Sequence, residues 1–436
     1  MLEKLLVVMC LDASRGESNR SLALRWGVAL VTEPADVAAI AAELSRAPLV
    51  AFDLEFLSQD RLVPTLCLLQ VSWLPANIGL DAPAGQIVAV EPPIRLIDPL
   101  AVDVRPVIEA LAAHPLVVAH APRQDLGLLA TRFKVSMPGI VDTQLMAAFT
   151  GIGDQVGLAA LANELLGTSL GKDQQWTAWE RRPLSDAQIT YAAADVRYLP
   201  ALYALLAEKL GPRIAWVREE SRAVLDDALA ASAVTPETAW ENVGGARYLD
   251  AASHAALVAM AAWRQQTAID MDRPLGQVLN EKTLVELAKS RPDTANEIRG
   301  IKGISPIAKT RAQEIVDALA VARTAPAKPA APRPPSRAAS PRAQRWSELL
   351  LAIVQLVSDE TGIAARLLGT RSDAEAFART VDEHGLDAAK SLPALSTWRR
   401  EVLGQVWEGW LAGTVALRGD TETAQGMRLV WKAPPA

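Results

Sequence analysis

The sequence predicts an α/β domain followed by two small all-helical domains. Apolar segments typical of strands alternate with amphipathic helical patterns from about residue 26 to residue 156, and only helical patterns follow. Strands mixed with helices in this way indicate an α/β domain. A stretch rich in Pro, Ala and Arg then divides the helical part in two. The length of 436 residues, at roughly 150 residues per domain, agrees with three domains.

The α/β domain is expected to span residues 26–220. Short apolar or alternating runs predict strands at residues 27–31, 49–56, 65–73, 95–98, 116–120 and 140–141. Helices are expected at residues 33–47, 104–113 and 123–133 and from residue 142, and further helices continue to about residue 219. Residues 1–25 are ambiguous, because they could form a first strand with its loop or a dispensable leader.

Two helical domains are expected at residues 253–321 and 346–418. The first contains helical patterns at residues 255–269, 281–290, 294–298 and 305–321. Residues 322–345 separate the two domains. The stretch 325–345 holds six prolines and no acidic residue, so we expect a semi-extended linker. Residues 419–436 are expected to form a poorly ordered tail.

The composition excludes several classes of protein. Two cysteines, Cys10 and Cys67, are too few for a disulfide framework or a cysteine-based zinc cluster. The four histidines show no metal-ligand spacing, so any metal must be held mainly by carboxylates. Carboxylate ligands favour magnesium or manganese. A net charge of −6 argues against a protein that is basic overall, although it says little about local basic patches.

Membrane segments and nucleotide-binding loops are not expected. No apolar run reaches the length of about 18 residues that a membrane helix needs. Residues 167–172 (GTSLGK) are one residue short of a phosphate-binding P-loop, and Asp173 replaces the required Ser or Thr. We therefore expect a cytoplasmic protein with no membrane partner and no nucleotide cofactor.

Two acidic residues lie in the apolar segment at residues 52–56 (FDLEF). Residues two apart on a strand point to the same side, so Asp53 and Glu55 would share one face while their apolar neighbours face a core. Adjacent carboxylates in apolar surroundings repel each other and lose solvation unless a cation neutralises them. A divalent cation and an edge strand with two solvated acids are both compatible with this segment alone.

A tyrosine and two further acids occur later in the chain. Ser185 and Gln188 form the pattern of a capping box, which predicts the start of a helix. Tyr191 and Asp195 would lie four residues apart on one face of that helix. Asp125 follows a predicted strand and a Pro-containing turn. Taken singly these residues have structural explanations, since an acid at a helix start often interacts only with the helix dipole.

Together and in this order, the segments resemble the three exonuclease motifs of the DEDD superfamily, in its tyrosine-containing branch and specifically in the ribonuclease D family. The resemblance covers about residues 26–215. It includes residues 68–70 (LLQ), 141–145 (VDTQL), 147–149 (AAF) and 179–185 (WERRPLS). It implies an RNase H-like exonuclease domain in which helices flank a mixed central sheet.

The resemblance also implies a mechanism and a cofactor. Two divalent metal ions, Mg²⁺ or Mn²⁺, would promote phosphodiester hydrolysis. Asp53 would bridge both ions, and Glu55 and Asp195 would complete the site of the ion that activates water. Asp125 would support the ion at the leaving 3′ oxygen. Tyr191 would orient the attacking water, because a phenol with a pKa near 10 is better suited to hydrogen bonding than to acting as a base.

Several polar residues are candidates for contact with the substrate. Gln70 and His120 lie beside the motifs, but each could equally satisfy neighbouring backbone groups. Arg182 could bind a phosphate or belong to a solvated surface. A basic stretch in the first helical domain could bind phosphates in a salt-dependent way or form a solvated helix face. Its residues are Arg299, Lys302, Lys309 and Arg311.

Both helical domains resemble the HRDC domain that RecQ-type helicases share with ribonuclease D. In the first, the similarity lies in residues 263–264 (WR), 272–274 (DRP), 284–288 (LVELA) and 301–304 (IKGI). In the second, which is more diverged, it lies in residues 362–368 and 398–404. The sequence therefore predicts two HRDC-like domains after the exonuclease domain.

The resemblance implies a metal-dependent 3′→5′ exoribonuclease that releases nucleoside 5′-monophosphates. Its substrate would be RNA with a free 3′ end, such as tRNA precursors or other small structured RNAs. One alternative is a 3′→5′ DNA exonuclease of the Werner type, because contacts to the 2′-hydroxyl cannot be read from sequence. A second alternative is a non-catalytic RNA-binding protein on the same fold, against which the full set of acids argues.

Overall fold

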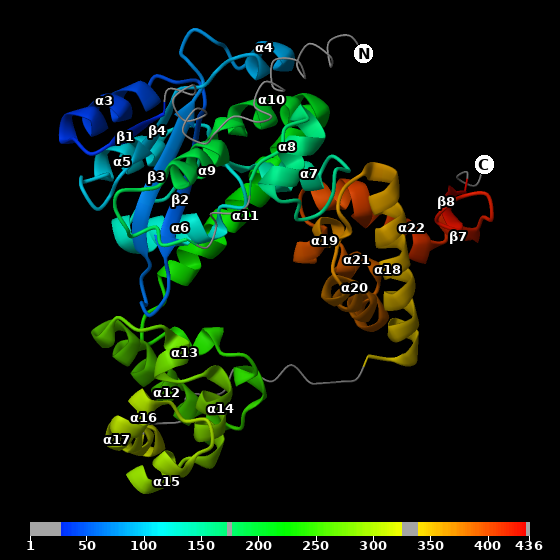
Figure 1. The fold of residues 1–436 in the computed structure, drawn as a ribbon. Helices are drawn as coiled ribbons and strands as arrows, with labels where there is room; N and C mark the ends of the chain where they lie inside the picture. Colours follow the sequence, from blue (N-terminus) through cyan, green and yellow to red (C-terminus); the bar gives the residue numbers. More distant parts are fainter. Residues whose placement is uncertain (1–27, 172–176, 325–338, 433–436) are drawn as a thin grey trace.

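The computed structural model describes residues 28–171, 177–324 and 339–432. Figure 1 shows three bodies: an α/β domain, a first helical domain beside the far end of its long strands, and a second helical domain against its flank. The ambiguous residues 1–25 lie outside the described residues.

A six-stranded mixed sheet forms the centre of the α/β domain. Its strand order is β1-β4-β3-β2-β5-β6, with antiparallel pairing of β2 to β3 and of β3 to β4 and parallel pairing elsewhere. The strands are β1 (Ala29–Val31), β2 (Val50–Leu57), β3 (Thr65–Trp73), β4 (Ile94–Ile97), β5 (Val117–Ala119) and β6 (Ile140–Asp142). The mixed sheet that the sequence predicts is therefore confirmed.

Each face of the sheet has its own hydrophobic core. Phe52 and Leu54 of β2 face a core beneath α3 (Pro34–Leu44), α5 (Arg105–Ala113), α6 (Arg123–Phe133) and the end of α11 (Ile214–Ser232). Ala51 of the same strand faces the opposite core, which holds α9 (Asp186–Arg197) and α10 (Leu199–Leu210). The helices α4 (Ala84–Val88), α7 (Thr143–Ala148) and α8 (Leu158–Leu166) pack on that second face. Because successive side chains of β2 point to opposite faces of the sheet, Asp53 and Glu55 face the same side as Ala51, toward α9.

The helix α11 is longer than the sequence pattern indicates. It follows the short turn η2 (Gly211–Arg213) and continues to Ser232, whereas the α/β domain was expected to end at residue 220. Leu225 and Ala228 are buried in the core that also contains α3, α5 and α6, so the additional turns of α11 belong to this domain.

The first helical domain has a separate core. Its elements are η3 (Ala239–Asn242), η4 (Ala246–Tyr248), α12 (Ala251–Met271), α13 (Leu275–Val278), α14 (Glu281–Ser290), α15 (Ala295–Gly300), α16 (Pro306–Thr310) and α17 (Ala312–Thr324). Side chains of Asp250, Asn280 and Thr294 accept hydrogen bonds from backbone amides and fix the starts of α12, α14 and α15. The single helix predicted at residues 305–321 is interrupted at Arg311.

The second helical domain shares its core with the α/β domain. The indole of Trp398 stacks on that of Trp216 of α11, with 5.4 Å between ring centroids, and meets the ring of Phe149 edge-on. Glu220 accepts from the Trp398 indole N–H at 2.9 Å and pairs with Arg399 at 2.8 Å. The elements of the second helical domain are α18 (Pro341–Thr361), α19 (Ala365–Leu368), α20 (Arg371–His384), α21 (Leu386–Ala389), η5 (Pro393–Leu395), η6 (Arg400–Gly404) and α22 (Gln405–Ala412).

Two boundaries near the C-terminus differ from the prediction. The helix α18 begins at Pro341, inside the segment predicted as linker, because Ser340 caps it and proline suits a first helical position. Residues 419–432 are not the poorly ordered tail that was expected. An antiparallel hairpin forms there, from β7 (Val415–Gly419) and β8 (Met427–Trp431), so this domain is not purely helical.

Candidate active site

Three of the predicted acidic residues converge between β2 and α9. Carboxylate oxygens of Asp53, Glu55 and Asp195 lie within 4.8 Å of one another. The capping box of Ser185 and Gln188 starts α9 as the sequence predicts and so sets the rotation of that helix. Tyr191 lies one turn before Asp195, so the two side chains lie on the same face of α9.

The fourth acid, Asp125, reaches the same cleft from α6. It lies in the first turn of that helix and is almost fully buried. The turn before α6 requires Ala121 at a φ of 53°, a left-handed conformation. Asp142 holds this turn, because its carboxylate accepts from the amides of Ala121 at 2.9 Å and Gln144 at 2.8 Å. Asp142 thus caps α7 and also holds the turn that leads into Asp125.

The electrostatics of the cleft favour a bound cation. Burial raises the pKa of Asp53 to about 7. Burial, followed by repulsion from the three neighbouring carboxylates, raises the pKa of Glu55 to about 10. Burial, followed by repulsion from Asp53, also raises the pKa values of Asp125 and Asp195 well above the ordinary range. Four carboxyl groups therefore share a site that penalises their ionisation.

The donor set fits hard divalent cations. The converging groups are carboxylates, which are the ligands that Mg²⁺ and Mn²⁺ prefer. Binding such a cation would remove the repulsion that raises these pKa values. Burial and the same carboxylates raise the pKa of Tyr191, so its phenol stays protonated and can donate a hydrogen bond.

A cleft of about 810 Å³ opens over these residues. All five predicted catalytic residues line it, together with Phe56, Ser58, Arg123, Gln124, Gln144, Leu158 and Leu170. Sequence reasoning did not single out these seven. The only signal for Arg123 and Gln124 was their place in the helical turn that leads into Asp125.

His120 lines the cleft next to Thr143. Its Nδ1 atom lies 2.9 Å from the Thr143 hydroxyl, which in turn lies 3.2 Å from the Ala119 carbonyl. The Nε2 atom is buried and has no hydrogen-bond partner among the described residues. Burial lowers the pKa of His120 to about 4, which keeps the ring neutral. Its predicted contact with substrate stays a prediction.

Gln70 does not line the cleft, and its predicted contact with substrate stays a prediction. It pairs with Asp53 in the β2–β3 register and is completely buried in the sheet. Cross-strand partners share a face, so Gln70 lies beside Asp53 on the side of the sheet that faces α9.

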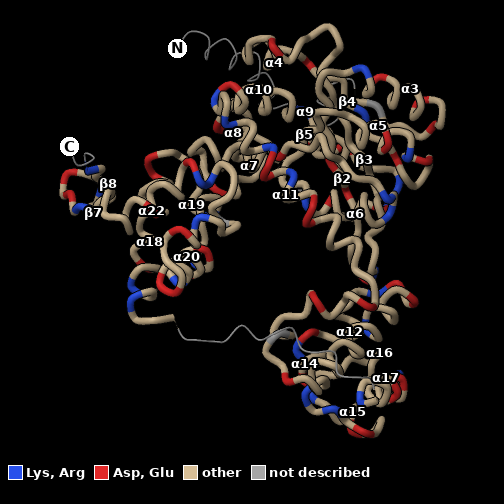
Figure 2. Tube along the Cα trace, turned by 180° about the vertical axis from the view of Figure 1, so that it is seen from behind, with Lys and Arg blue, Asp and Glu red and all other residues tan. Residues whose placement is uncertain are grey.

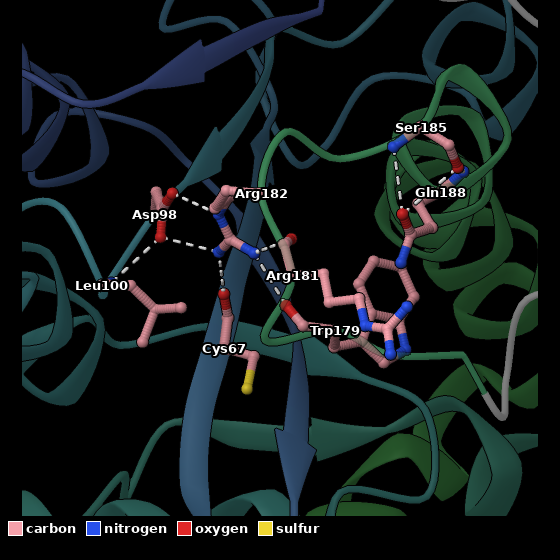
Figure 3. Close-up of polar contacts among 8 residues, drawn as sticks. All are labelled: Cys67, Asp98, Leu100, Trp179, Arg181, Arg182, Ser185 and Gln188. Atoms are coloured by element: carbon pink, nitrogen blue, oxygen red, sulfur yellow. Dashed lines mark hydrogen bonds and ion pairs between the residues drawn. The ribbon is translucent and has the colours of Figure 1, made fainter.

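Arg182 is bound into the fold through its guanidinium (Figure 3), and its predicted phosphate contact stays a prediction. Its guanidinium binds the buried Asp98 carboxylate through two nitrogens, one of them at 2.7 Å. It also donates to the carbonyls of Cys67 and Trp179, each at 2.7 Å. These bonds fix the segment before α9 to the ends of β3 and β4. Arg182 therefore helps to place Tyr191 and Asp195 without facing the cleft.

The basic stretch of the first helical domain is not brought to the cleft. Lys302 and Lys309 are exposed. The guanidinium of Arg299 donates to Asn296 at 3.0 Å, and that of Arg311 pairs with Glu314 at 3.1 Å. Figure 2 shows acidic residues interspersed with basic ones on this domain. Contact of these four residues with RNA stays a prediction.

The fold and site define a 3′→5′ exonuclease followed by an HRDC domain. A family profile described as 3′-5′ exonuclease matches residues 28–211, and one described as HRDC domain matches residues 253–319. No helix among the described residues has the length and apolar character to cross a membrane.

The chain belongs to the ribonuclease D family and is an exoribonuclease. Ribonuclease D of Granulibacter bethesdensis is 34% identical over 389 residues, a match that covers 86% of this chain and 90% of the relative. Ribonuclease D of Gluconacetobacter diazotrophicus is 32% identical with the same coverage. The crystal structure of Escherichia coli RNase D has the same fold, with a TM-score of 0.72 and 24% identity over 88% of this chain and 99% of that one. The two alternatives left open by the sequence are not favoured.

Proposed function

We propose that this exoribonuclease removes 3′-terminal nucleotides with two divalent ions, Mg²⁺ or Mn²⁺. The observation that carries the proposal is the convergence of Asp53, Glu55 and Asp195, with Asp125 lining the same cleft. The ions, when bound, would polarise the attacking water and offset charge on the leaving 3′ oxygen. Asp53 would bridge them, Glu55 and Asp195 would hold one, and Asp125 would hold the other.

The remaining polar groups of the cleft orient the reactants. Tyr191 keeps its proton, so it would donate a hydrogen bond and hold the attacking water or a phosphate oxygen in line. It would not serve as the base. The neutral ring of His120 lines the cleft, and its Nε2 atom, which has no hydrogen-bond partner among the described residues, would be available to a ribose hydroxyl or a base.

We further propose that the substrates are tRNA precursors and other small structured RNAs in the cytoplasm. The E. coli enzyme is described as an exoribonuclease involved in structured RNA processing. In this chain the helical domains would hold the body of the RNA while its single-stranded 3′ end enters the cleft. The exposed lysines Lys302 and Lys309 are available for such contacts.

A time course on a 5′-labelled RNA hairpin with a single-stranded 3′ tail tests the proposal. The full-length protein should produce a ladder that shortens from the 3′ end with Mg²⁺ or Mn²⁺, and chelator or Asp53→Asn should abolish it. The variant Glu43→Gln, on the exposed side of α3, is a matched control and should keep full activity. A DNA hairpin of the same sequence should be a poorer substrate. Hydrolysis that persists in chelator would overturn the metal assignment, and equal rates on DNA would overturn the sugar preference.

A further inference from the structure

A second groove continues from the catalytic cleft. It has a volume of about 500 Å³ and shares Phe56, Ser58, Arg123 and Gln124 with the cleft. Its walls are α6, the loop between β2 and β3, and the last turns of α11. The groove therefore begins where the acidic site ends and leads away from it across one flank of the α/β domain.

Gly127 lines this groove, and close packing against a neighbouring element does not explain why the residue there is glycine. It lies inside α6, where glycine is less favourable than alanine by about 1 kcal/mol. A Cβ atom built at Gly127 would meet nothing within 4 Å. The facing turn of α11 contributes the small side chains of Ala228 and Ala231. A larger residue at position 127 would project into the groove, so the glycine keeps this space open.

The chemistry of the groove differs from that of the cleft. None of the described residues that line it is acidic, so it does not suit a metal ion. Phe56 is a half-buried aromatic ring at its junction with the cleft, and Leu62, Pro64 and Leu128 add apolar surface. Arg123 supplies a cation. It pairs with Asp227 at 3.5 Å, but both side chains are about two-thirds exposed, and such pairs are weak and readily exchanged.

We propose that this groove binds the nucleotides on the 5′ side of the scissile bond in single-stranded RNA. The inference rests on the proposed function and extends it by naming where the rest of the strand lies. Apolar and aromatic surface with one phosphate-binding cation is typical of sites that hold single strands without regard to sequence. Phe56 stacks on a base and Arg123 exchanges Asp227 for a backbone phosphate. A dinucleotide would bind at the acidic site alone and would not reach into the groove.

The first helical domain adjoins the outer end of the groove. The Asp272 carboxylate at the end of α12 accepts from the amides of Leu62 at 3.1 Å and Val63 at 3.4 Å. Gln277 of α13 donates to the Asp60 carboxylate at 2.7 Å. These bonds hold the β2–β3 loop as a fixed wall, and Figure 1 shows the loop extending toward α13. A strand that leaves the groove therefore meets the HRDC domain.

The test fills the groove and compares substrates of different length. Full-length Gly127→Leu should lower kcat/KM for a single-stranded RNA 8-mer about tenfold more than it lowers kcat/KM for a dinucleotide, as expected for loss of a stacked base. Gly85→Leu is the matched control, because Gly85 is also a helical glycine with open space but lines neither cavity. It should leave the ratio of the two substrates unchanged.

A binding measurement tests the groove without turnover, and a second groove-filling variant tests it if the first does not fold. In the Asp53→Asn background, Gly127→Leu should weaken binding of the 8-mer about tenfold in fluorescence anisotropy. Ala231→Phe fills the groove from its exposed wall on α11 and should act in the same way if Gly127→Leu does not fold. Arg123→Ala should reduce the slope of log affinity against log salt by about one, whereas Asp227→Ala should not reduce it.

The outcomes separate this proposal from the proposed function. An equal loss on both substrates, or no loss on the 8-mer with either groove-filling variant, would overturn the groove as a binding subsite. If the unmodified protein hydrolyses neither RNA in the presence of metal, the proposed function fails instead.

Discussion

Replacing Asp53 by asparagine should stabilise the metal-free protein while it abolishes activity. The pKa of Asp53 rises from 3.8 to about 7 on burial. The native state therefore keeps a proton that the unfolded state releases as pH rises above 3.8. Stability is lost progressively over this window, and the loss is complete above about pH 7. At about 1.4 kcal/mol per pH unit, this destabilises the free wild-type protein by about 4 kcal/mol at pH 8. Asparagine has the same shape and carries no charge, so it avoids this cost.

Urea unfolding followed by tryptophan fluorescence measures the effect. In chelator, the difference in unfolding free energy between Asp53→Asn and wild type should grow between pH 5 and pH 7 and level off by pH 8. Saturating Mg²⁺ or Mn²⁺ should stabilise the wild type and leave the variant unchanged, because the neutral amide replaces a charged ligand. Glu43→Gln removes a surface carboxylate and should shift stability by less than about 0.5 kcal/mol at every pH.

Two results would refute this reasoning. The first is a variant that is less stable than wild type in chelator at pH 8, since Asp53 would then contribute to folding rather than oppose it. The second is a stability difference that does not change between pH 5 and pH 8, since the cost would then not arise from ionisation.

The remaining predictions concern one catalytic and two structural residues. Tyr191→Phe should lower kcat about 10²-fold with little change in the metal concentration needed for half-maximal rate, as expected from loss of one positioning group; an unchanged kcat would remove its role. Arg182→Lys cannot reproduce the two-nitrogen contact with Asp98. It should lower both the melting temperature and kcat without altering the salt dependence of RNA binding, and a changed salt slope would show that Arg182 meets phosphate after all. Trp398→Ala should destabilise the protein by about 3–5 kcal/mol in urea unfolding, and a loss below about 1 kcal/mol would show that the second helical domain is not part of the catalytic domain's core.

The local pattern of the sequence determined how the predicted catalytic residues are placed within their strand and helix, and the resemblance to ribonuclease D supplied their predicted roles. Asp53 and Glu55 share a face because strand geometry repeats every two residues, and Tyr191 and Asp195 stack because helix geometry repeats close to every four. The capping box at Ser185 fixed where that helix begins. These relations involve neighbours in the chain, so the residues alone predicted them.

Tertiary structure decided which polar residues line the cleft and which are bound into the fold. The sequence around Arg182 is compatible with a surface cation, and only the fold brings Asp98, 84 residues away, beside it. The sequence does not reveal that Gln70 is completely buried in the sheet, where it pairs with Asp53 across β2 and β3. Trp398 and Glu220 meet across 178 residues. The groove beside Gly127 arises only where α6, α11 and the β2–β3 loop come together. Local periodicity specifies the direction of a side chain within its element, whereas long-range packing decides what that side chain meets.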